Sequence, residues 1–218
     1  MLLEPIQRSK LDESDDELFY DLPRLVLHID EGFVEQLGNL YRERLKPNTR
    51  ILDMMSSWVS HLPEEMEFAH VEGHGMNEEE LAKNTRLNSY FVQDLNKNTQ
   101  LPLSDRSFDA VLNTVSVQYL QNPEAVFAEI HRILKPGGIA IISFSNRMFY
   151  QKAIQAWRDG TDASRVELVK SYFNSVPGFK GFSVPEVIAR RGSTPGLLQF
   201  LGVGVSDPFY AVIAYNNS

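Results

Sequence analysis

The 218-residue sequence contains no cysteine. Disulfide bonds, thiolate metal ligands and cysteine nucleophiles are therefore excluded, and the chain does not fit a secreted domain that disulfides hold together. It also lacks any apolar run near the roughly 20 residues that a membrane-spanning helix needs. Its N-terminus lacks the layout of a signal peptide. We therefore expect a cytoplasmic protein that makes no contact with a membrane.

Positive charge is in deficit, with 21 basic against 29 acidic residues and a formal net charge of −8. A surface of this sign repels phosphate backbones and anionic lipids, so no nucleic acid and no membrane surface is expected as a partner. The histidines show no HExxH motif and no other ligand spacing, so we predict no metal site. What remains is a globular chain, 43% apolar and 23% charged, of a length that suits one domain.

Short apolar segments alternate with segments of helical periodicity. We expect strands at 50–55, 68–73, 89–93, 108–116, 139–145, 185–191 and 207–215. We expect helices at 30–46, 77–84, 122–134, 148–157 and 163–173, the first three with N-caps at Asp30, Asn77 and Asn122. Such alternation is typical of an α/β fold with a doubly wound, mostly parallel sheet and helices on both faces. Ligands bind to such sheets at the carboxyl ends of the strands.

Glycine is missing from the turn where this fold normally places it. The first strand ends at Asp53, and the turn that follows carries Met55, Ser57, Trp58 and Val59. A nicotinamide-dependent oxidoreductase shares the expected sheet type but needs a GxGxxG motif at this point, so we set that function aside. The turn is still the first place to look for a ligand, because it lies at the carboxyl end of a strand.

The stretch "FDAVLNTVSVQYLQNPEAVFAEIHRILKPGG", residues 108–138, is the most specific part of the chain. Together with the strand ends before it, the region 48–146 resembles the class I S-adenosylmethionine-dependent methyltransferases, in particular the small-molecule group often called type 11. The resemblance implies a single Rossmann-like domain with a seven-stranded sheet whose last strand is antiparallel. Its parts would be a lead-in and cap helix (1–47), a cofactor-binding core (48–146), and substrate-side helices with C-terminal strands (147–218).

The resemblance also implies cofactor-binding residues at the strand ends. Asp53 is similar to the acid that begins the family's cofactor loop, and Asp94 to the acid that accepts a hydrogen bond from the adenine amino group. The backbone of Leu95 would face the adenine ring. Asn113, followed by Thr114, would lie beside the methionyl amino group.

Two departures from the family concern the loop and the ribose. Met55, Ser57 and Val59 stand where the family usually has glycines, and a side chain at a position that needs a positive φ costs about 1–2 kcal/mol. Gly75 stands where the family has the acid that holds both ribose hydroxyls, a charged contact of about 1.5–3 kcal/mol; its neighbour Met76 would pack on the adenine. Ser56 and Ser57 offer hydroxyls to a cofactor carboxylate beside an expected helix start; the alternative is that Ser57 or Ser60 only caps that helix.

The segment before the core offers a cover for the site. Tyr20 and Arg24 would reach over the cofactor, where the planar guanidinium suits a methionyl carboxylate; packing in a surface loop is the alternative. The acidic run at 12–17 reads as a solvated lead-in. Further residues expected at the rim are Trp58, Tyr119, Asn146, Arg147, Tyr150 and Trp157. Core packing is the alternative for Trp58, and a capped helix whose aromatic residues pack inward is the alternative for the segment 143–157.

The resemblance predicts in-line transfer of a methyl group from S-adenosyl-L-methionine to a small-molecule acceptor. Such transfer needs alignment of the reactants and exclusion of water rather than a covalent nucleophile. His28 and His61 are conceivable general bases, but the sequence selects neither, so no catalytic residue is assigned. The alternative is a catalytically inactive relative, a binding or regulatory module with weak or no cofactor affinity. A monomer and a homodimer both fit the sequence.

Overall fold

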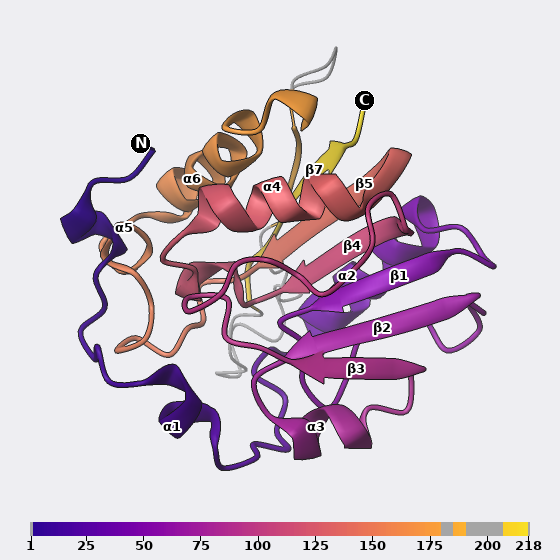
Figure 1. Cartoon of the computed structure of the whole chain (residues 1–218), viewed down its shortest axis with the longest axis horizontal. Helices are drawn as coiled ribbons and strands as arrows, with labels where there is room; N and C mark the ends of the chain where they lie inside the picture. Colours follow the sequence, from indigo (N-terminus) through magenta and orange to yellow (C-terminus); the bar gives the residue numbers. More distant parts are fainter. Residues whose placement is uncertain (1, 180–184, 191–206, 218) are drawn as a thin grey trace, which may run out of the picture.

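The computed structural model of the chain describes residues 2–179, 185–190 and 207–217. Its centre is a seven-stranded sheet with the order β3-β2-β1-β4-β5-β7-β6 (Figure 1). The strands are β1 (Arg50–Met54), β2 (His70–Gly75), β3 (Ser89–Val92), β4 (Phe108–Thr114), β5 (Leu134–Phe144), β6 (Glu186–Arg190) and β7 (Phe209–Tyr215). The first five strands run parallel, and β7 is antiparallel to its neighbours β5 and β6. The predicted fold class is confirmed, including the antiparallel last strand.

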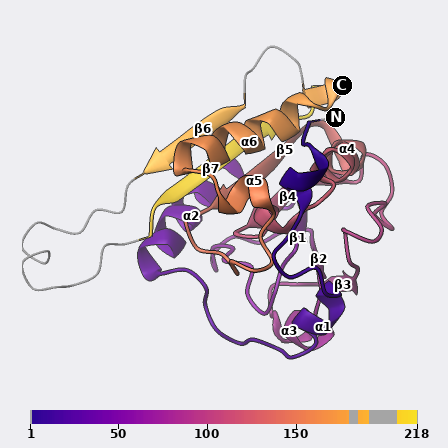
Figure 2. The ribbon, with the colours of Figure 1, turned by 90° about the vertical axis from the view of Figure 1, so that its left-hand side faces the viewer.

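Helices cover both faces of this sheet. The longer ones are α2 (Glu31–Arg44), which packs on one face, and α4 (Pro123–Ile133) and α6 (Asp162–Asn174), which pack on the other (Figures 1 and 2). Short helices are α1 (Asp16–Tyr20), α3 (Glu78–Lys83) and α5 (Gln155–Arg158), with 3-10 turns at Pro5–Arg8, Val117–Tyr119 and Pro177–Phe179. Among the described residues, none of the helices combines the length and the apolar content that crossing a bilayer requires.

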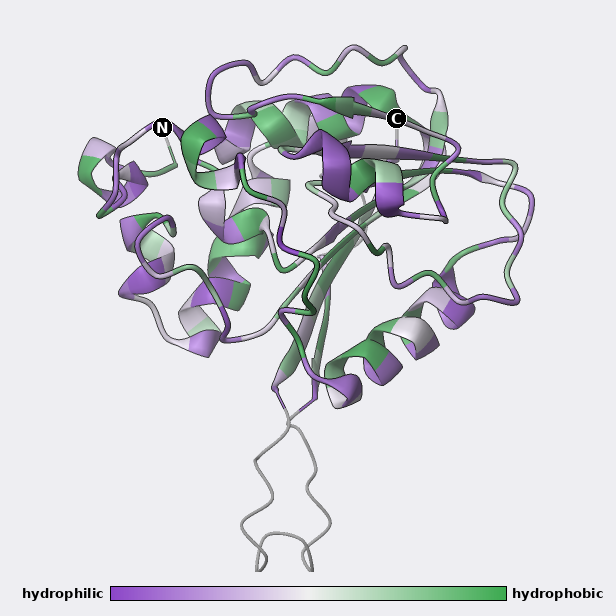
Figure 3. Cartoon of the chain, turned by 90° about the horizontal axis from the view of Figure 1, so that it is seen from below, coloured by the Kyte–Doolittle hydropathy of each residue, from purple (hydrophilic) through white to green (hydrophobic). Residues whose placement is uncertain are grey.

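The core consists of one apolar cluster on each side of the sheet. On the α4 side, Phe127 and Ile130 pack with Phe173 of α6, and on the other side Phe33 and Leu37 of α2 pack against the strands. These residues recur at helical spacing, so each helix turns one apolar stripe toward the sheet. Figure 3 shows the resulting apolar strands between the helical layers.

The N-caps predicted for two helices are confirmed. Asp30 Oδ1 accepts a hydrogen bond from the backbone N–H of Phe33 (2.8 Å), and Asn77 Oδ1 accepts one from the N–H of Glu80 (3.0 Å). Asn122 also stands at the predicted N-cap position of α4, but its side chain makes no capping hydrogen bond. Pro123 follows at the first helical position, where its missing N–H costs nothing.

Several predicted boundaries differ from the structure because contacts distant in sequence set them. No helix follows β1, since the N–H of Ser56 bonds instead to the carbonyl of His74 (2.6 Å) and ties the chain to β2. β2 runs on to Gly75, and β5 already begins at Leu134. The helix expected at 148–157 is reduced to α5. Residue 191 of the penultimate expected strand lies outside the described residues.

Candidate active site

A cavity of about 630 Å³ opens at the carboxyl ends of the parallel strands. Its wall takes residues from the segments that follow β1, β2, β3, β4 and β5. The order of the strands reverses between β1 and β4, and such a switch point is where doubly wound sheets bind their ligands. The volume falls within the roughly 300–1,000 Å³ of small-molecule sites. The sheet therefore provides a pocket of nucleoside size at the predicted place.

All but one of the predicted cofactor residues line this cavity. The lining residues are Tyr20, Arg24, Asp53, Met55, Ser56, Ser57, Gly75, Met76, Asp94, Leu95 and Thr114. The exception is Asn113, whose side chain is fully buried and donates to the carbonyl of Met54 on β1 (3.2 Å). Asn113 thus joins two strands of the sheet, and it is Thr114 that reaches the cavity.

Most of the residues expected at the rim also lie at the cavity. Its wall includes His28, Trp58, His61, Tyr119, Asn146, Arg147 and Tyr150. Trp157 is buried against Phe144 instead, with ring centroids 4.9 Å apart. For this residue the structure shows core packing.

The glycine-free loop accommodates a methionine in a left-handed conformation. Met55 has φ +56°, a backbone region that glycine usually occupies. Its N–H donates to His74 Nδ1 (3.1 Å), and its carbonyl accepts from the Ser116 hydroxyl (3.1 Å). Contacts from β2 and from the segment after β4 thus hold the loop. The side chains of Met55 and Trp58 line the cavity instead of filling it.

His74 supports this loop as a neutral imidazole. Because its Nδ1 accepts from Met55, the ring proton lies on Nε2 and is donated to the carbonyl of Gln93 (2.9 Å). Burial lowers the pKa of His74 to about 4. One imidazole therefore links the segments after β1 and β3, a role that no local sequence pattern indicates.

The two loop serines are both engaged by carboxylates of the protein. The hydroxyl of Ser56 donates to Asp53 Oδ2 (2.6 Å), and that of Ser57 donates to Glu80 Oε2 (2.5 Å). Burial raises the pKa of Asp53 to about 6, with hydrogen bonds from Ser56 and Ser60 acting in the opposite direction. Since no helix starts here, the expected helix N-terminus beside the serines is also absent.

Glu80 is a site residue that the sequence did not single out. It projects from α3 into the cavity wall, is 9% exposed, and accepts from the N–H of Arg24 (2.6 Å) as well as from Ser57. In the sequence it looks like an acid placed to suit the helix dipole. The Asn77-x-x-Glu80 spacing is that of a capping box, but this glutamate points to other partners.

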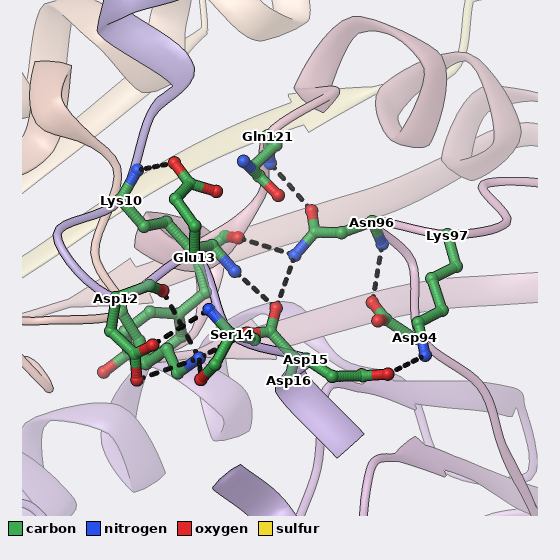
Figure 4. Close-up of polar contacts among 12 residues, drawn as sticks. Lys10, Asp12, Glu13, Ser14, Asp15, Asp16, Asp94, Asn96, Lys97 and Gln121 are labelled. Carbon is green, nitrogen blue, oxygen red and sulfur yellow. Dashed lines mark hydrogen bonds and ion pairs between the residues drawn. The ribbon is translucent and has the colours of Figure 1, made fainter. Parts of the chain in front are cut away.

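The N-terminal strap, residues 10–29, contributes to the cavity wall and is held by polar contacts to the rest of the chain. Near its start, buried Asp16 forms an ion pair with Lys10 and accepts a hydrogen bond from Asn96 (3.0 Å) (Figure 4). Asp16 also forms an ion pair with Lys152 (3.2 Å). The acidic run is therefore not fully solvated, in contrast to the prediction. Further along, Asn77 Nδ2 donates to the carbonyl of Tyr20 (2.8 Å). In Figures 1 and 2, α1 accordingly lies beside α3.

Arg24 of the strap lines the cavity and has a buried donor without a hydrogen-bond partner among the described residues. Its guanidinium stacks on the rings of Phe19 (4.4 Å) and Phe149 (5.5 Å), and Nη2 donates to the Phe19 carbonyl (2.7 Å). Nη1 is buried and has no hydrogen-bond partner among the described residues. A buried cationic donor without a partner is costly, so this geometry suits an anionic ligand group.

Burial favours the neutral form of the two histidines at the wall. His28 packs edge-on to Phe149 (5.1 Å), and burial lowers its pKa from the ordinary value. Burial likewise lowers the pKa of His61. Both imidazoles are therefore neutral at pH 7, the state that a general base needs.

Three carboxylates near the strap, of Asp15, Glu17 and Asp94, approach one another closely. Lys97 forms ion pairs with Asp15 (2.8 Å) and Glu17 (2.9 Å). Asp94 Oδ1 accepts from the N–H of Asn96 (2.8 Å). The lysine offsets the local negative charge, and Asp94 remains in the cavity wall.

Comparison with known proteins agrees with this geometry. Residues 59–142 match the family model described as a methyltransferase domain. Over 134 residues the chain is 29% identical to a malonyl-[acyl-carrier protein] O-methyltransferase of Marinomonas sp. (strain MWYL1), covering 61% of this chain and 42% of that protein. Over 137 residues it is 31% identical to a protein of the same name from Hahella chejuensis (strain KCTC 2396), covering 60% and 48%. The chain thus spans less than half the length of these relatives.

The fold is shared with solved structures. One is a chain from the complex between the Haloferax volcanii Trm112 methyltransferase activator and a methyltransferase, with a TM-score of 0.59 and 16% identity over 87% of this chain and 91% of that one. Sequence match, fold and the position of the cavity agree. Together they support a class I S-adenosylmethionine-dependent methyltransferase.

Proposed function

We propose that the chain binds S-adenosylmethionine in the cavity and directs its methyl group to a small-molecule acceptor. S-adenosylmethionine is the cofactor of the family, and it supplies a methyl group on a positively charged sulfur. The observation that carries the proposal is the cavity of about 630 Å³ at the switch point, which stays open although the loop after β1 has no glycine.

The polar groups of the cavity fit such a cofactor. Arg24 has a buried Nη1 without a partner among the described residues, which suits the methionyl carboxylate. Asp94 lies in the wall at the end of β3, where an acceptor for the adenine amino group is expected. These placements support the proposal over the alternative of an inactive binding module.

The chain's own contribution to the reaction would be positioning and exclusion of water. The N-terminal strap covers the site, and its contacts hold Tyr20 and Arg24 at the cavity wall. Aligning bound reactants in a dry site accelerates a displacement that needs no covalent nucleophile. If the acceptor is a hydroxyl, neutral His28 or His61 can take its proton.

A carboxyl group on a protein-carried acyl chain is a second candidate acceptor. The names of the two relatives point to it, although each match covers less than half of the relative. The structure adds that Val26 and Leu27 are exposed and line the cavity, which gives the entrance an apolar side suited to an acyl chain.

Calorimetric titration tests the binding step. We expect heat of binding at micromolar concentrations of S-adenosylmethionine or S-adenosylhomocysteine. No heat at millimolar ligand would overturn the proposal in favour of the inactive module. Incubation with cofactor that carries a deuterated methyl group, followed by mass spectrometry of small molecules and of carrier protein, then distinguishes the two acceptors.

A further inference from the structure

We infer that Glu80 supplies the carboxylate that accepts hydrogen bonds from the two ribose hydroxyls of the bound nucleoside. The inference rests on the proposed function, because it concerns how the same cavity holds its ligand. It assigns this task to a residue of α3 instead of the last residue of β2.

The end of β2 has no room for a side chain. A Cβ on Gly75 would stand 2.5 Å from the carbonyl oxygen of Ser56 and 3.2 Å from Leu81 Cδ2. The Ser56 backbone cannot easily withdraw, because its N–H bonds to the carbonyl of His74 (2.6 Å). In doubly wound sheets an acid just after the second strand bonds the ribose. Here the loop after β1 excludes an acid from that position.

Glu80 brings a carboxylate to the same corner of the cavity. Gly75, Ser57 and Glu80 all line it, and the Ser57 hydroxyl bonds to Glu80 Oε2 at 2.5 Å. The Arg24 N–H bonds to the other oxygen, Oε1, at 2.6 Å. Glu80 lines the cavity, and these two contacts fix the rotation of its carboxylate.

The carboxylate retains acceptor capacity on both oxygens. Two carboxylate oxygens together offer about four acceptor sites, and the hydrogen bonds described use one on each. Two adjacent acceptors match the two adjacent donors of a ribose diol. The partners of Glu80 within the described residues are a hydroxyl and a backbone N–H, both uncharged, so two further donors would stabilise this 9% exposed anion.

The test compares two ligands on two variants of the full chain. The ligands are S-adenosylhomocysteine and its 2′-deoxyribose counterpart, and the quantity measured by calorimetry is the ratio of their Kd values. In the wild type we expect the missing hydroxyl to weaken binding about 10- to 100-fold. In Glu80→Gln we expect weaker binding of S-adenosylhomocysteine and a ratio near one. Glu78→Gln, an exposed position on the same helix, serves as the control and should keep the wild-type ratio.

Each outcome has a distinct meaning. An equal ratio in the wild type and in Glu80→Gln overturns the assignment, while the proposed function survives. A wild type that binds neither ligand overturns both. If Glu80→Gln does not fold, Glu80→Asp keeps the charge but shortens the reach, and we then expect the same fall in the ratio; an unchanged ratio again overturns the assignment.

Discussion

The carbonyl oxygen of Ser56 lies 2.5 Å from the point where a Cβ on Gly75 would stand. The loop after β1 therefore occupies the space in which a side chain at the end of β2 would begin. This contact links the two departures from the family, the bulky loop and the missing ribose acid. A loop without glycine takes a path that requires glycine on the neighbouring strand.

Gly75→Ala should therefore destabilise the fold and disturb the loop. We expect the free energy of unfolding to fall by about 1–3 kcal/mol, because the added methyl overpacks a backbone contact. Urea denaturation measures the change. The control is Gly38→Ala in α2, where a Cβ meets only Arg42 Nη1 at 3.4 Å and alanine favours the helix. Equal stability of Gly75→Ala and the wild type would show that the loop can move away.

Arg24 should contribute to the affinity for ligands that carry a carboxylate and much less to the affinity for ligands that lack one. We expect Arg24→Gln to weaken the binding of S-adenosylhomocysteine about 10- to 100-fold, because a charge-assisted contact is lost. Binding of 5′-methylthioadenosine, which has no carboxylate, should change much less. Arg42→Gln, at an exposed ion pair with Glu65, is the matched control. A similar loss for both ligands would assign Arg24 to stacking with Phe19 and Phe149 instead.

Much of the fold follows from signals that lie within a few residues of one another. The side chain of Asp30 caps the helix it precedes, and α4 has an apolar stripe that its sequence displays. The positions of the strand ends in the sequence likewise predicted the location of the cavity, because the carboxyl ends of parallel strands lie at one edge of a sheet.

The part of the site that was not predicted depends on contacts between distant segments. The segment after β1 looked like a helix start, but His74 and Ser116 hold it in another path. In the sequence, Glu80 is only an acid that suits the start of a helix dipole; in the fold, the Ser57 hydroxyl and the Arg24 N–H bond to its oxygens. Gly75 at the end of β2 is the one sequence signal of this arrangement. It can be interpreted only with the structure, which shows that the Ser56 carbonyl lies against it.

Asp53 should make stability fall as the pH rises. Its pKa is raised from 3.8, the ordinary value that the unfolded chain keeps, to about 6 in the fold, so between pH 4 and 6 the folded state binds the additional proton. The wild type should lose about 2 kcal/mol relative to Asp53→Asn as the pH rises from 4 to 7. Urea denaturation of both proteins at several pH values gives this difference, and all groups common to both cancel. A constant difference would mean that Asp53 titrates normally.

His74 should have the opposite effect over a similar range. Its pKa is lowered from 6.5 to about 4 in the fold, so the unfolded chain binds the additional proton between these values. As the pH falls from 7 to 4, the wild type should lose about 3 kcal/mol relative to His74→Gln. The same denaturation series measures this. Protonated Nδ1 also cannot accept from the N–H of Met55, so cofactor binding should weaken toward pH 4. Parallel stability curves for the two proteins would contradict the assignment.

Lys152 should hold the N-terminal strap closed. Its side chain is fully buried and contacts Asp16 Oδ1 (3.2 Å), Asp12 (3.2 Å) and the carbonyl of Ser14 (2.8 Å). Removing one partner of a buried ion pair costs about 3–5 kcal/mol, because it leaves a charge without compensation. Here the strap can open to water, so we expect this loss to appear as local opening while the sheet stays folded.

Hydrogen exchange measures that opening directly. In Lys152→Met, amides of the strap should exchange at least about 10-fold faster than in the wild type, while amides of β1 and β4 keep their rates. Binding of S-adenosylhomocysteine should weaken in parallel, because Tyr20 and Arg24 leave the cavity wall with the strap. Lys170→Met is the control, since its pair with Glu167 lies at the surface and contributes about 0–1 kcal/mol. Unchanged exchange in the strap would mean that the contacts of Lys10 and Asn77 are sufficient to hold it.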